Sequence, residues 1–577
     1  MSLINRTIII TFATFFLVVC HVWYAGYGIV GLGVQQNNFT WMFVCLVIGL
    51  ALFSMHNNKR FVMPRFWLLG SVAIIITLLP FTISNKEYFL NGYLLIIGLV
   101  AAWIFLLAIL QFEAFEKRPD ILLWLVFGAI FIQVIWGGVG SFNSVMINQV
   151  NERLVVDPAA LGVFNQKNVF ASFLATGLGL SIFLFCKSEF NNKRIQTMSS
   201  FGHIVFAFIA AFTLVYSNSR AGYIGSVISL LFVFPYCFKI NKTKVSLWLL
   251  FAIMGLVLAI SLLESTGRVE KELTEGGSRV GIYLTSFKLM LDAPLLGNGA
   301  GSFMRTFIEK FSILNQQGML PDGSGHGNLV HPHNELLLWG VEGGFISVLG
   351  LLALSLILLR HSSKGVVKKL LFLGLLSPIV LHSMVEMPFY QSALHIVVLV
   401  LIFVSIYHQF GRKEKGKVYG LNNFNSGLPI VGFFICTASV MFFALNISSL
   451  NNLHKFIQQE NRGIDELSKV YIHVGWENTY DYMYYGTLYQ QGLKSNNPKL
   501  IKEYINWANE INKKAPKLDY FRTLVYAYEQ LGDIDKAYST VEKLDFYYPL
   551  HKPTQEWIEK FYTHMESKGY SNPQGVN

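Results

Sequence analysis

A cluster of polar residues between His326 and Phe345 is the strongest chemical signal in the chain. The segment reads HGNLVHPHNELLLWGVEGGF, so three histidines, an asparagine and a glutamate stand immediately before an apolar run. An imidazole changes its charge near neutral pH, and at the surface of a membrane it could take up or release protons. We therefore expect interfacial chemistry here. The candidate site residues are His331, His333, Asn334 and Glu335.

Two other interpretations of this segment stay open. The HxH pair and His326 offer three nitrogens to a zinc ion, although no HExxH frame surrounds them. Alternatively, the segment only begins a helix, because Pro332 stiffens it and Asn334 is a good N-cap residue.

Further polar residues stand at the ends of other apolar runs, and alternate loops place all of them on one side of the membrane. They are Gln166, Lys167 and Asn168 in GVFNQKNVFA, Arg220 in SNSRAG, Arg279 in GGSRVGIY, and Glu386 and Tyr390 in HSMVEMPFYQ. Two arginines could hold a pyrophosphate through bidentate hydrogen bonds, and the amides could orient a sugar.

Each of these residues also has a structural explanation. Arg220 could snorkel or cap a helix, Arg279 could form a salt bridge within its loop, and the amides could join neighbouring helices. Glu386 and Glu342 could belong to structural pairs. The glycines of PLLGNGAGSF (294–303) are expected only to permit turns, since no GK[ST] follows them.

The composition identifies a membrane protein. Of its 577 residues 53% are hydrophobic and 14% are charged, with a mean hydropathy of +0.46. We attribute the net charge of +11 to basic cytoplasmic loops and not to nucleic-acid binding. The five cysteines lie in hydrophobic segments and form neither a disulfide framework nor a CxxC motif.

Apolar runs of spanning length predict an all-α, polytopic membrane bundle of about 13 helices. They cover residues 7–26, 40–56, 66–84, 90–111, 121–137, 168–186, 201–217, 221–238, 245–263, 334–359, 367–385, 389–408 and 428–447. Lys and Arg concentrate in alternate loops, so we expect those loops in the cytoplasm. The catalytic loop 264–333 and the C-terminus then lie outside, in the periplasm of a bacterium with an inner membrane.

The sequence divides at residue 447. Residues 1–447 are expected to form the transmembrane domain, and residues 448–577 a small external helical domain. The stretch 526–549, with Ala527, Gly532, Ala537 and Pro549, has the pattern of a tetratricopeptide hairpin. Its DxD, Asp533 and Asp535, is interpreted as a helix start rather than a metal site.

Taken in order, HPHNELLLWGVEGG, PLLGNGAGSF, SRAG and HSMVEMPFY resemble the O-antigen ligase/polymerase superfamily of bacterial inner-membrane glycosyltransferases. The Gly162–Asn168 stretch and the helical tail resemble one branch, the PglL-type protein O-oligosaccharyltransferases. That branch usually reads Gly-Gln-Arg-Asn-His, whereas this chain has Lys167 in place of the arginine and Val169 in place of the histidine. Lysine keeps the charge but loses the bidentate fork.

The resemblance implies an inverting transfer of a glycan from undecaprenyl pyrophosphate, without a metal or another cofactor. The family histidine corresponds best to His333 and next to His331, the arginines to Arg220 and Arg279, the glutamine to Gln166 and the tyrosine to Tyr390.

Three functions stay open. The first is transfer to Ser/Thr hydroxyls of periplasmic or pilin-like proteins. The second is ligation to lipid A-core or polymerisation of O-antigen. The third is a transporter or flippase, which we disfavour because the polar residues gather at one face without an internal repeat. The expected partners are the lipid-linked oligosaccharide, its acceptor and membrane lipids.

Overall fold

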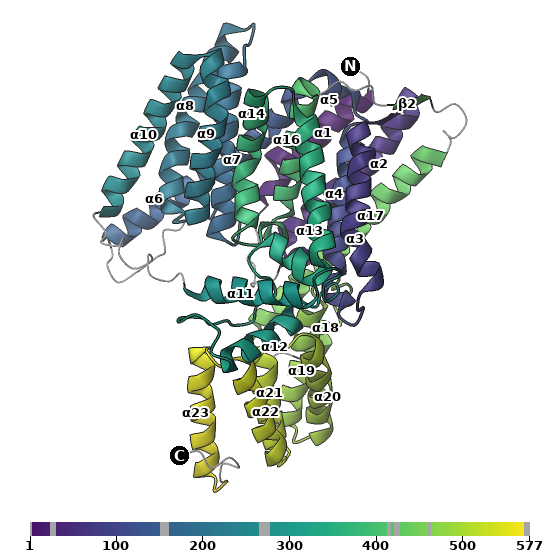
Figure 1. Ribbon diagram of the computed structural model, residues 1–577, viewed down its shortest axis with the longest axis vertical. Coiled ribbons are helices and arrows are strands. Elements are labelled where there is room, and N and C mark those ends of the chain that lie inside the picture. The colour runs from purple at the N-terminus through teal and green to yellow at the C-terminus, as the bar shows by residue number, and fades with distance from the viewer. Residues whose placement is uncertain are drawn as a thin grey trace. The chain divides into compact units, whose positions relative to one another are not determined.

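The computed structural model describes residues 3–22, 30–150, 161–264, 277–411, 417–420, 427–459 and 463–570, and these are mostly helical (Figure 1). Thirteen helices of this described part are long and apolar enough to cross a membrane, which confirms the predicted number. They are α1 (Leu3–Leu17) together with the 3₁₀ turn η1 (Val19–His21), then α2 (Gln35–Asn58), α3 (Arg65–Ile83), α4 (Phe89–Ile109), α6 (Asp120–Val150), α7 (Lys167–Lys187), α8 (Lys193–Tyr216), α9 (Arg220–Ile240), α10 (Lys242–Glu264), α13 (Glu335–Ser362), α14 (Val366–Ser383), α16 (Ala393–Phe410) and α17 (Gly427–Gln458).

The chain forms two compact units. The first unit contains Met1–Ile74, Ile97–Lys271 and Leu352–Ile447, and the second contains Ile75–Ile96, Glu272–Leu351 and Ser448–Asn577.

Helix α7 lies at the centre of the first unit, where its apolar stretch is entirely buried. It packs against α6, α8, α9 and α14, of which α9 and α14 lie beside it in Figure 1. Glycines allow these close approaches. A Cβ added at Gly179 would lie 2.5 Å from Ser229 Oγ of α9, and one at Gly177 would lie 2.4 Å from Ile130 of α6.

A two-stranded antiparallel sheet joins two segments of the first unit that were expected to be plain basic linkers. Strand β1 (Arg60–Met63) pairs with β2 (Lys417–Gly420), with Arg60 opposite Gly420. The side chain of Gln111 extends the pairing, since it accepts the Val62 N–H and donates to the Val62 carbonyl, both at 2.9 Å. Four-residue strands so far apart in sequence leave no local signal.

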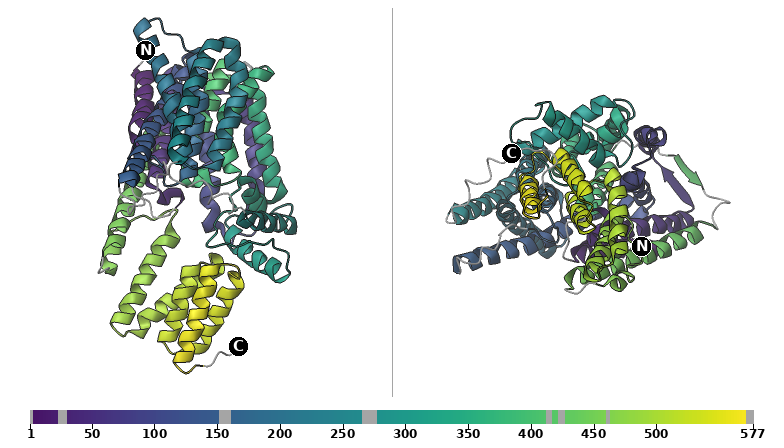
Figure 2. Two further views of the ribbon diagram at one scale, coloured as in Figure 1. Left: turned by 90° about the vertical axis from the view of Figure 1, so that its left-hand side faces the viewer. Right: turned by 90° about the horizontal axis from the view of Figure 1, so that it is seen from below.

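The second unit shows that much of the predicted 264–333 loop is helical, with α11 (Gly277–Asp292) and α12 (Phe303–Gln316). Residues 265–276 of this loop lie outside the described part. The tail contributes α18 (Ile464–Leu467), α19 (Glu477–Lys494), α20 (Pro498–Lys514), α21 (Leu518–Gln530), α22 (Ile534–Tyr547) and α23 (Lys552–Ser567). Helices α19 to α22, yellow-green to yellow in Figure 2, lie side by side.

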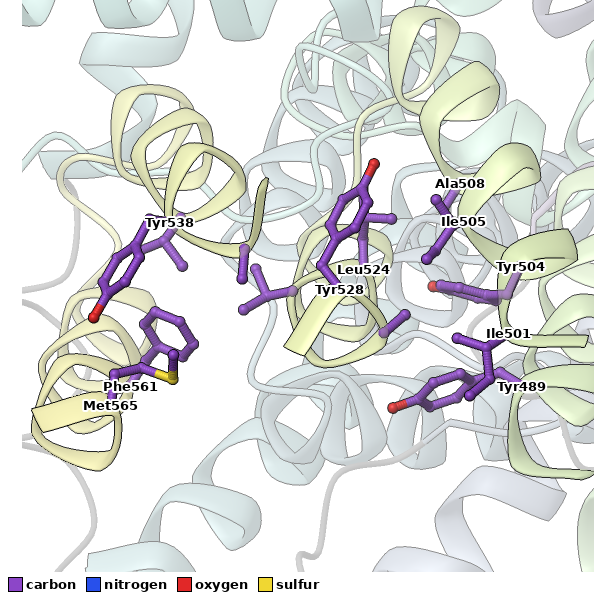
Figure 3. Close-up of a cluster of buried hydrophobic side chains, with 14 of the residues drawn as sticks. Tyr489, Ile501, Tyr504, Ile505, Ala508, Leu524, Tyr528, Tyr538, Phe561 and Met565 are labelled. Carbon is purple, nitrogen blue, oxygen red and sulfur yellow. The ribbon is translucent and has the colours of Figure 1, made fainter. Parts of the chain in front are cut away.

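The tail has an aromatic core, drawn in Figure 3, in which Tyr504, Tyr528, Phe561 and Met565 are buried. The predicted 526–549 hairpin is confirmed as a helical hairpin of α21 and α22. Ala527 and Ala537 are fully buried where the two helices meet, and Gly532 turns the chain with a φ of 75°.

The tail shares a second core with the loop helix α12. Ile308 of α12 packs with Leu544 and Tyr548. The amide oxygen of Asn328 accepts hydrogen bonds from the Leu518 N–H, at 2.9 Å, and from the Tyr548 hydroxyl, at 3.2 Å. Within the second unit, the tail and the segment before α13 therefore form one body.

Candidate active site

The histidine segment is a tight turn at the start of α13. Asn334 caps the helix, and its Oδ1 accepts the Leu337 N–H at 3.0 Å, so the predicted N-cap is confirmed. His333 stands just before it with a φ of 56°, in the left-handed region. Its N–H donates to His331 Nδ1 at 2.9 Å. His331 thus bonds the backbone two residues on, as Asn and Asp do in an Asx-turn.

This hydrogen bond assigns the tautomer of His331. Because Nδ1 accepts, the neutral ring carries its proton on Nε2, which lies 3.6 Å from Glu335 Oε1. The side chains of His331 and Glu335 are 2% and 9% exposed, so the pair is buried. The ring of His333 is half-buried and lies 6.4 Å, centroid to centroid, from that of His331. His333 is thus the more exposed ring of the two, and His331 is the one that holds the backbone of the turn.

Tyr283 connects the helix of Arg279 with the turn at His333. Arg279 is an exposed residue in the first turn of α11, and Tyr283 follows it by one helical turn on the same face. The Tyr283 hydroxyl donates to the His333 carbonyl at 3.3 Å. This hydrogen bond ties α11, the helix of Arg279, to the turn that carries His333.

His326 belongs to the core and not to this turn. Its ring packs edge-on against Phe311, with centroids 4.4 Å apart, and near Tyr548 at 5.2 Å, while Nδ1 bonds the Gly327 carbonyl. Burial lowers the pKa of His326 to about 4, with a smaller contribution from His551. Across the described residues, no group of three His, Cys, Asp or Glu side chains is arranged to hold a metal ion.

The PLLGNGAGSF segment fits against a break in α13. The helix is interrupted at Gly344, with φ 66° and ψ −171°, and the Phe345 N–H bonds the Pro294 carbonyl at 2.7 Å. A Cβ at Gly344 would lie 2.3 Å from the Leu295 carbonyl oxygen. The glycines of PLLGNGAGSF itself, Gly297, Gly299 and Gly301, have φ values of 65°, 98° and 75°, so they do form the expected turns. Glu342 also has a structural partner, because its buried carboxylate accepts the Phe303 N–H at 3.4 Å.

In the first unit, the amino ends of α7 and α9 are tied together. Ser219 donates to Asn168 Oδ1 at 2.7 Å and caps α9 by accepting the Gly222 N–H at 3.1 Å. Asn168 therefore does join helices, as its alternative interpretation proposed. Arg220 is the first residue of α9 and is exposed, while Lys167, the first residue of α7, is half-buried. Helix amino ends and cations together favour anions.

Gln166 meets the segment between α14 and α16. Its Nε2 lies 3.5 Å from Glu386 Oε2, a weak contact, and Glu386 is only 6% exposed. Gln166 Oε1 is buried and has no hydrogen-bond partner among the described residues. Tyr390 lies in the short helix α15 (Pro388–Gln391), where its carbonyl accepts from Asn37 Nδ2 at 3.1 Å.

The predicted residues thus fall into two groups, each inside one unit. The first unit holds Gln166, Lys167, Asn168, Arg220, Glu386 and Tyr390; the second holds Arg279, His331, His333, Asn334 and Glu335. Sequence reasoning missed Ser172 and His395, which touch the Glu386 segment. The only signal for them was a serine and a histidine placed in apolar helices.

Two family models match the chain. The model described as O-Antigen ligase matches residues 205–354, and the one described as Virulence factor membrane-bound polymerase, C-terminal, matches residues 370–560. No curated protein and no solved structure gives a significant match. Together, the fold and the two matches define a multi-pass membrane enzyme that is similar to O-antigen ligases and polymerases. The chain belongs to the O-antigen ligase/polymerase superfamily.

Proposed function

We propose that the protein is an O-oligosaccharyltransferase of the bacterial inner membrane. It moves a glycan en bloc from undecaprenyl pyrophosphate to Ser or Thr hydroxyls of periplasmic or pilin-like proteins, in the manner of PglL-type enzymes. The observation that carries the proposal is the turn at His333, held by His331 and joined through Tyr283 to the helix of Arg279.

The proposed reaction is a single displacement. The acceptor oxygen attacks the anomeric carbon, the bond from that carbon to the pyrophosphate oxygen breaks, and configuration inverts. His333 takes the hydroxyl proton, and polyprenyl pyrophosphate leaves with the bonding electrons. Arg220 and Arg279 bind the pyrophosphate charge, while Gln166, Lys167, Asn168, Glu386, Tyr390, Asn334 and Glu335 complete the substrate contacts. No step uses a metal ion.

A second candidate has the same donor but a different acceptor. The O-Antigen ligase model matches the region of Arg220, Arg279 and His333, which favours ligation to lipid A-core, or polymerisation, as the alternative. The tail favours a protein acceptor, because its helical hairpins share a core with α12 and bond Asn328, and so are anchored to the segment that leads to His333.

The test is transfer by purified full-length protein. Labelled lipid-linked oligosaccharide from the host membrane is offered with host periplasmic protein, with lipid A-core or alone. Product on protein supports the proposal; product only on lipid A-core, or only longer lipid-linked glycan, replaces it with the second candidate.

Arginine variants test the pyrophosphate contact. Arg220→Ala should lose roughly 10²–10³ in rate, as expected for one strong contact to developing charge, and Arg220→Lys should lose less. The matched control is Arg118→Ala, since Arg118 is an exposed arginine that pairs with Asp120 in another loop. Wild-type rates in Arg220→Ala would remove Arg220 from the site.

The orientation follows from the alternating loop charges and needs its own measurement. Reporters fused after residues 320 and 459 should lie on the outer side of the membrane. A reporter fused after residue 411 should lie in the cytoplasm. A cytoplasmic result at 320 would place the histidine turn on the wrong side for a periplasmic acceptor, and a cytoplasmic result at 459 would overturn the number of spans.

A further inference from the structure

Four buried side chains of the first unit connect α7 to both ends of the segment that carries Glu386 and Tyr390. Ser172 of α7 is at the centre, with its Oγ 2.8 Å from His382 Nδ1 and 3.1 Å from His395 Nε2. Ser392 Oγ lies 2.9 Å from the other nitrogen of His395. The exposure of all four is 4% or less. We call Ser172, His382, His395 and Ser392 the serine–histidine clasp.

One arrangement of protons satisfies every hydrogen bond of the clasp. Ser172 Oγ is also 3.1 Å from the Val169 carbonyl, which can only accept, so the hydroxyl donates its single proton there. Its lone pairs then accept from both rings. His382 therefore carries its proton on Nδ1 and His395 on Nε2, and His395 Nδ1 accepts from Ser392. Two neutral imidazoles satisfy this network, in surroundings where a charged ring would be costly.

The clasp holds the Glu386 segment from both sides. His382 is in the last turn of α14, and its carbonyl accepts the Glu386 N–H at 2.9 Å. His395 is in the first turn of α16, just beyond Tyr390. Asn37 of α2 adds a third tie, because it accepts the Ala393 N–H at 2.7 Å and donates to the Tyr390 carbonyl.

The same helix carries the partner of Glu386. Gln166 is the residue that precedes α7, six residues before Ser172, and its amide nitrogen faces Glu386 Oε2. The start of α7 thus contacts the Glu386 segment through Gln166 and Glu386, which are candidate substrate-binding residues. Farther along α7, Ser172 contacts the two helices that flank this segment through the clasp. The segment between α14 and α16 contains only the four-residue helix α15 and cannot fix its own position.

We propose that the serine–histidine clasp is a positioning device, which sets Glu386 against Gln166 for glycan transfer. The inference rests on the proposed function for the role of those two residues. Misplacing a substrate contact by about 1 Å costs up to about 10²-fold in rate. A clasp outside the reacting site can therefore affect the rate by fixing the position of Glu386.

Reciprocal amide substitutions test the hydrogen bonds without substrate. An Asn side chain places its NH₂ near the position of Nδ1, and a Gln side chain reaches the position of Nε2. We therefore expect His382→Asn to preserve the clasp and His382→Gln to break it, with the opposite order at His395. If the two histidines only filled space, the same amide substitution, Asn or Gln, would be better tolerated at both positions.

The readout is crosslinking in purified full-length protein whose five native cysteines are replaced. Cysteines introduced by Gln166→Cys and Glu386→Cys are joined with a short bismaleimide. His382→Gln and His395→Asn should slow this crosslinking by about tenfold, the ratio for one lost buried hydrogen bond, while His382→Asn and His395→Gln stay close to the parent. Thr176→Val is the matched control, because Thr176 is equally buried one turn along α7 and its hydroxyl bonds the Ser172 carbonyl of its own helix.

Transfer rates test whether the clasp acts through Glu386. Glu386→Gln and His382→Gln should each lower the rate, and the double variant should be little slower than the slower single one. Additive losses would overturn positioning through Glu386, and equal crosslinking in all four amide variants would overturn the clasp itself. If one amide variant fails to fold, the pair at the other histidine decides. Absence of transfer by the wild-type protein would refute the proposed function. The crosslinking test needs no substrate, so it would still show whether the clasp fixes the position of residue 386.

Discussion

His331 and His333 should be separable by substitution, although they are neighbours in one motif. His333→Ala removes the ring proposed to take the acceptor proton, and general acid–base help of this kind is worth about 10²–10⁴ in rate. His331→Ala leaves that ring in place but removes the acceptor of the His333 N–H. His331→Asn restores an acceptor, because an Asn side chain makes the same bond to the backbone two residues on.

The structure sets the size of the indirect effect. Losing the bond from His333 N–H to His331 Nδ1 costs about 0.5–1.5 kcal/mol. The left-handed backbone at His333 costs roughly 1–2 kcal/mol in the wild type and in the variant alike, so it does not add to the change. A loss of about 0.5–1.5 kcal/mol lowers the population of the competent turn about 2- to 12-fold. His331→Ala should therefore fall between His331→Asn, near wild type, and His333→Ala.

The assay is transfer of labelled lipid-linked glycan by equal amounts of folded, purified variants. Glycan release to water is measured in parallel, because a misplaced base could favour water over the acceptor. The reasoning fails if His331→Asn is as slow as His331→Ala, since the tie would then be irrelevant. Wild-type transfer by His333→Ala would end the catalytic role of that residue.

Three further predictions concern stability. The pKa of His326 is about 4 in the folded protein and about 6.5 in the unfolded chain. The unfolded state therefore binds the proton first, and the free energy of unfolding should fall by up to about 3 kcal/mol as the pH drops from 6.5 to 4. His326→Leu should flatten this dependence of the melting temperature on pH. Gly344→Ala should lower the unfolding midpoint more than Gly318→Ala, because both glycines are left-handed but only at Gly344 would the new Cβ meet backbone; equal losses would refute this. Asn446→Leu should cost about 1 kcal/mol in membrane-stability assays, since Asn446 donates to Asn38 inside the bundle at 2.6 Å; an unchanged midpoint would contradict it.

The sequence determined the features that local chemistry sets. A helix must be about 20 apolar residues long to cross a bilayer, so each span is visible in its own stretch of chain, and all thirteen were predicted. The cap at Asn334, the turns of PLLGNGAGSF and the hairpin around Gly532 are likewise determined within a few residues. The order of short motifs also sufficed to identify the superfamily.

Some local signals were present but were given too little weight. Phe303, Phe307 and Phe311 recur every four residues and form the buried face of α12, although the whole 264–333 stretch was expected to be a loop. The pattern is that of an amphipathic helix, and the polar residues between these phenylalanines concealed it.

Tertiary structure alone decided which distant residues meet. Ser172 lies 210 residues from His382, β1 lies more than 350 residues from β2, and nothing at either end encodes the pairing. The three histidines of one motif also receive different environments: His326 is packed among aromatic rings, His331 accepts a backbone N–H and lies near a carboxylate, and His333 is half-buried. Residue type fixes what an imidazole can do, but burial and hydrogen-bond partners come from segments far away in the chain, and these decide which imidazole is available to a substrate.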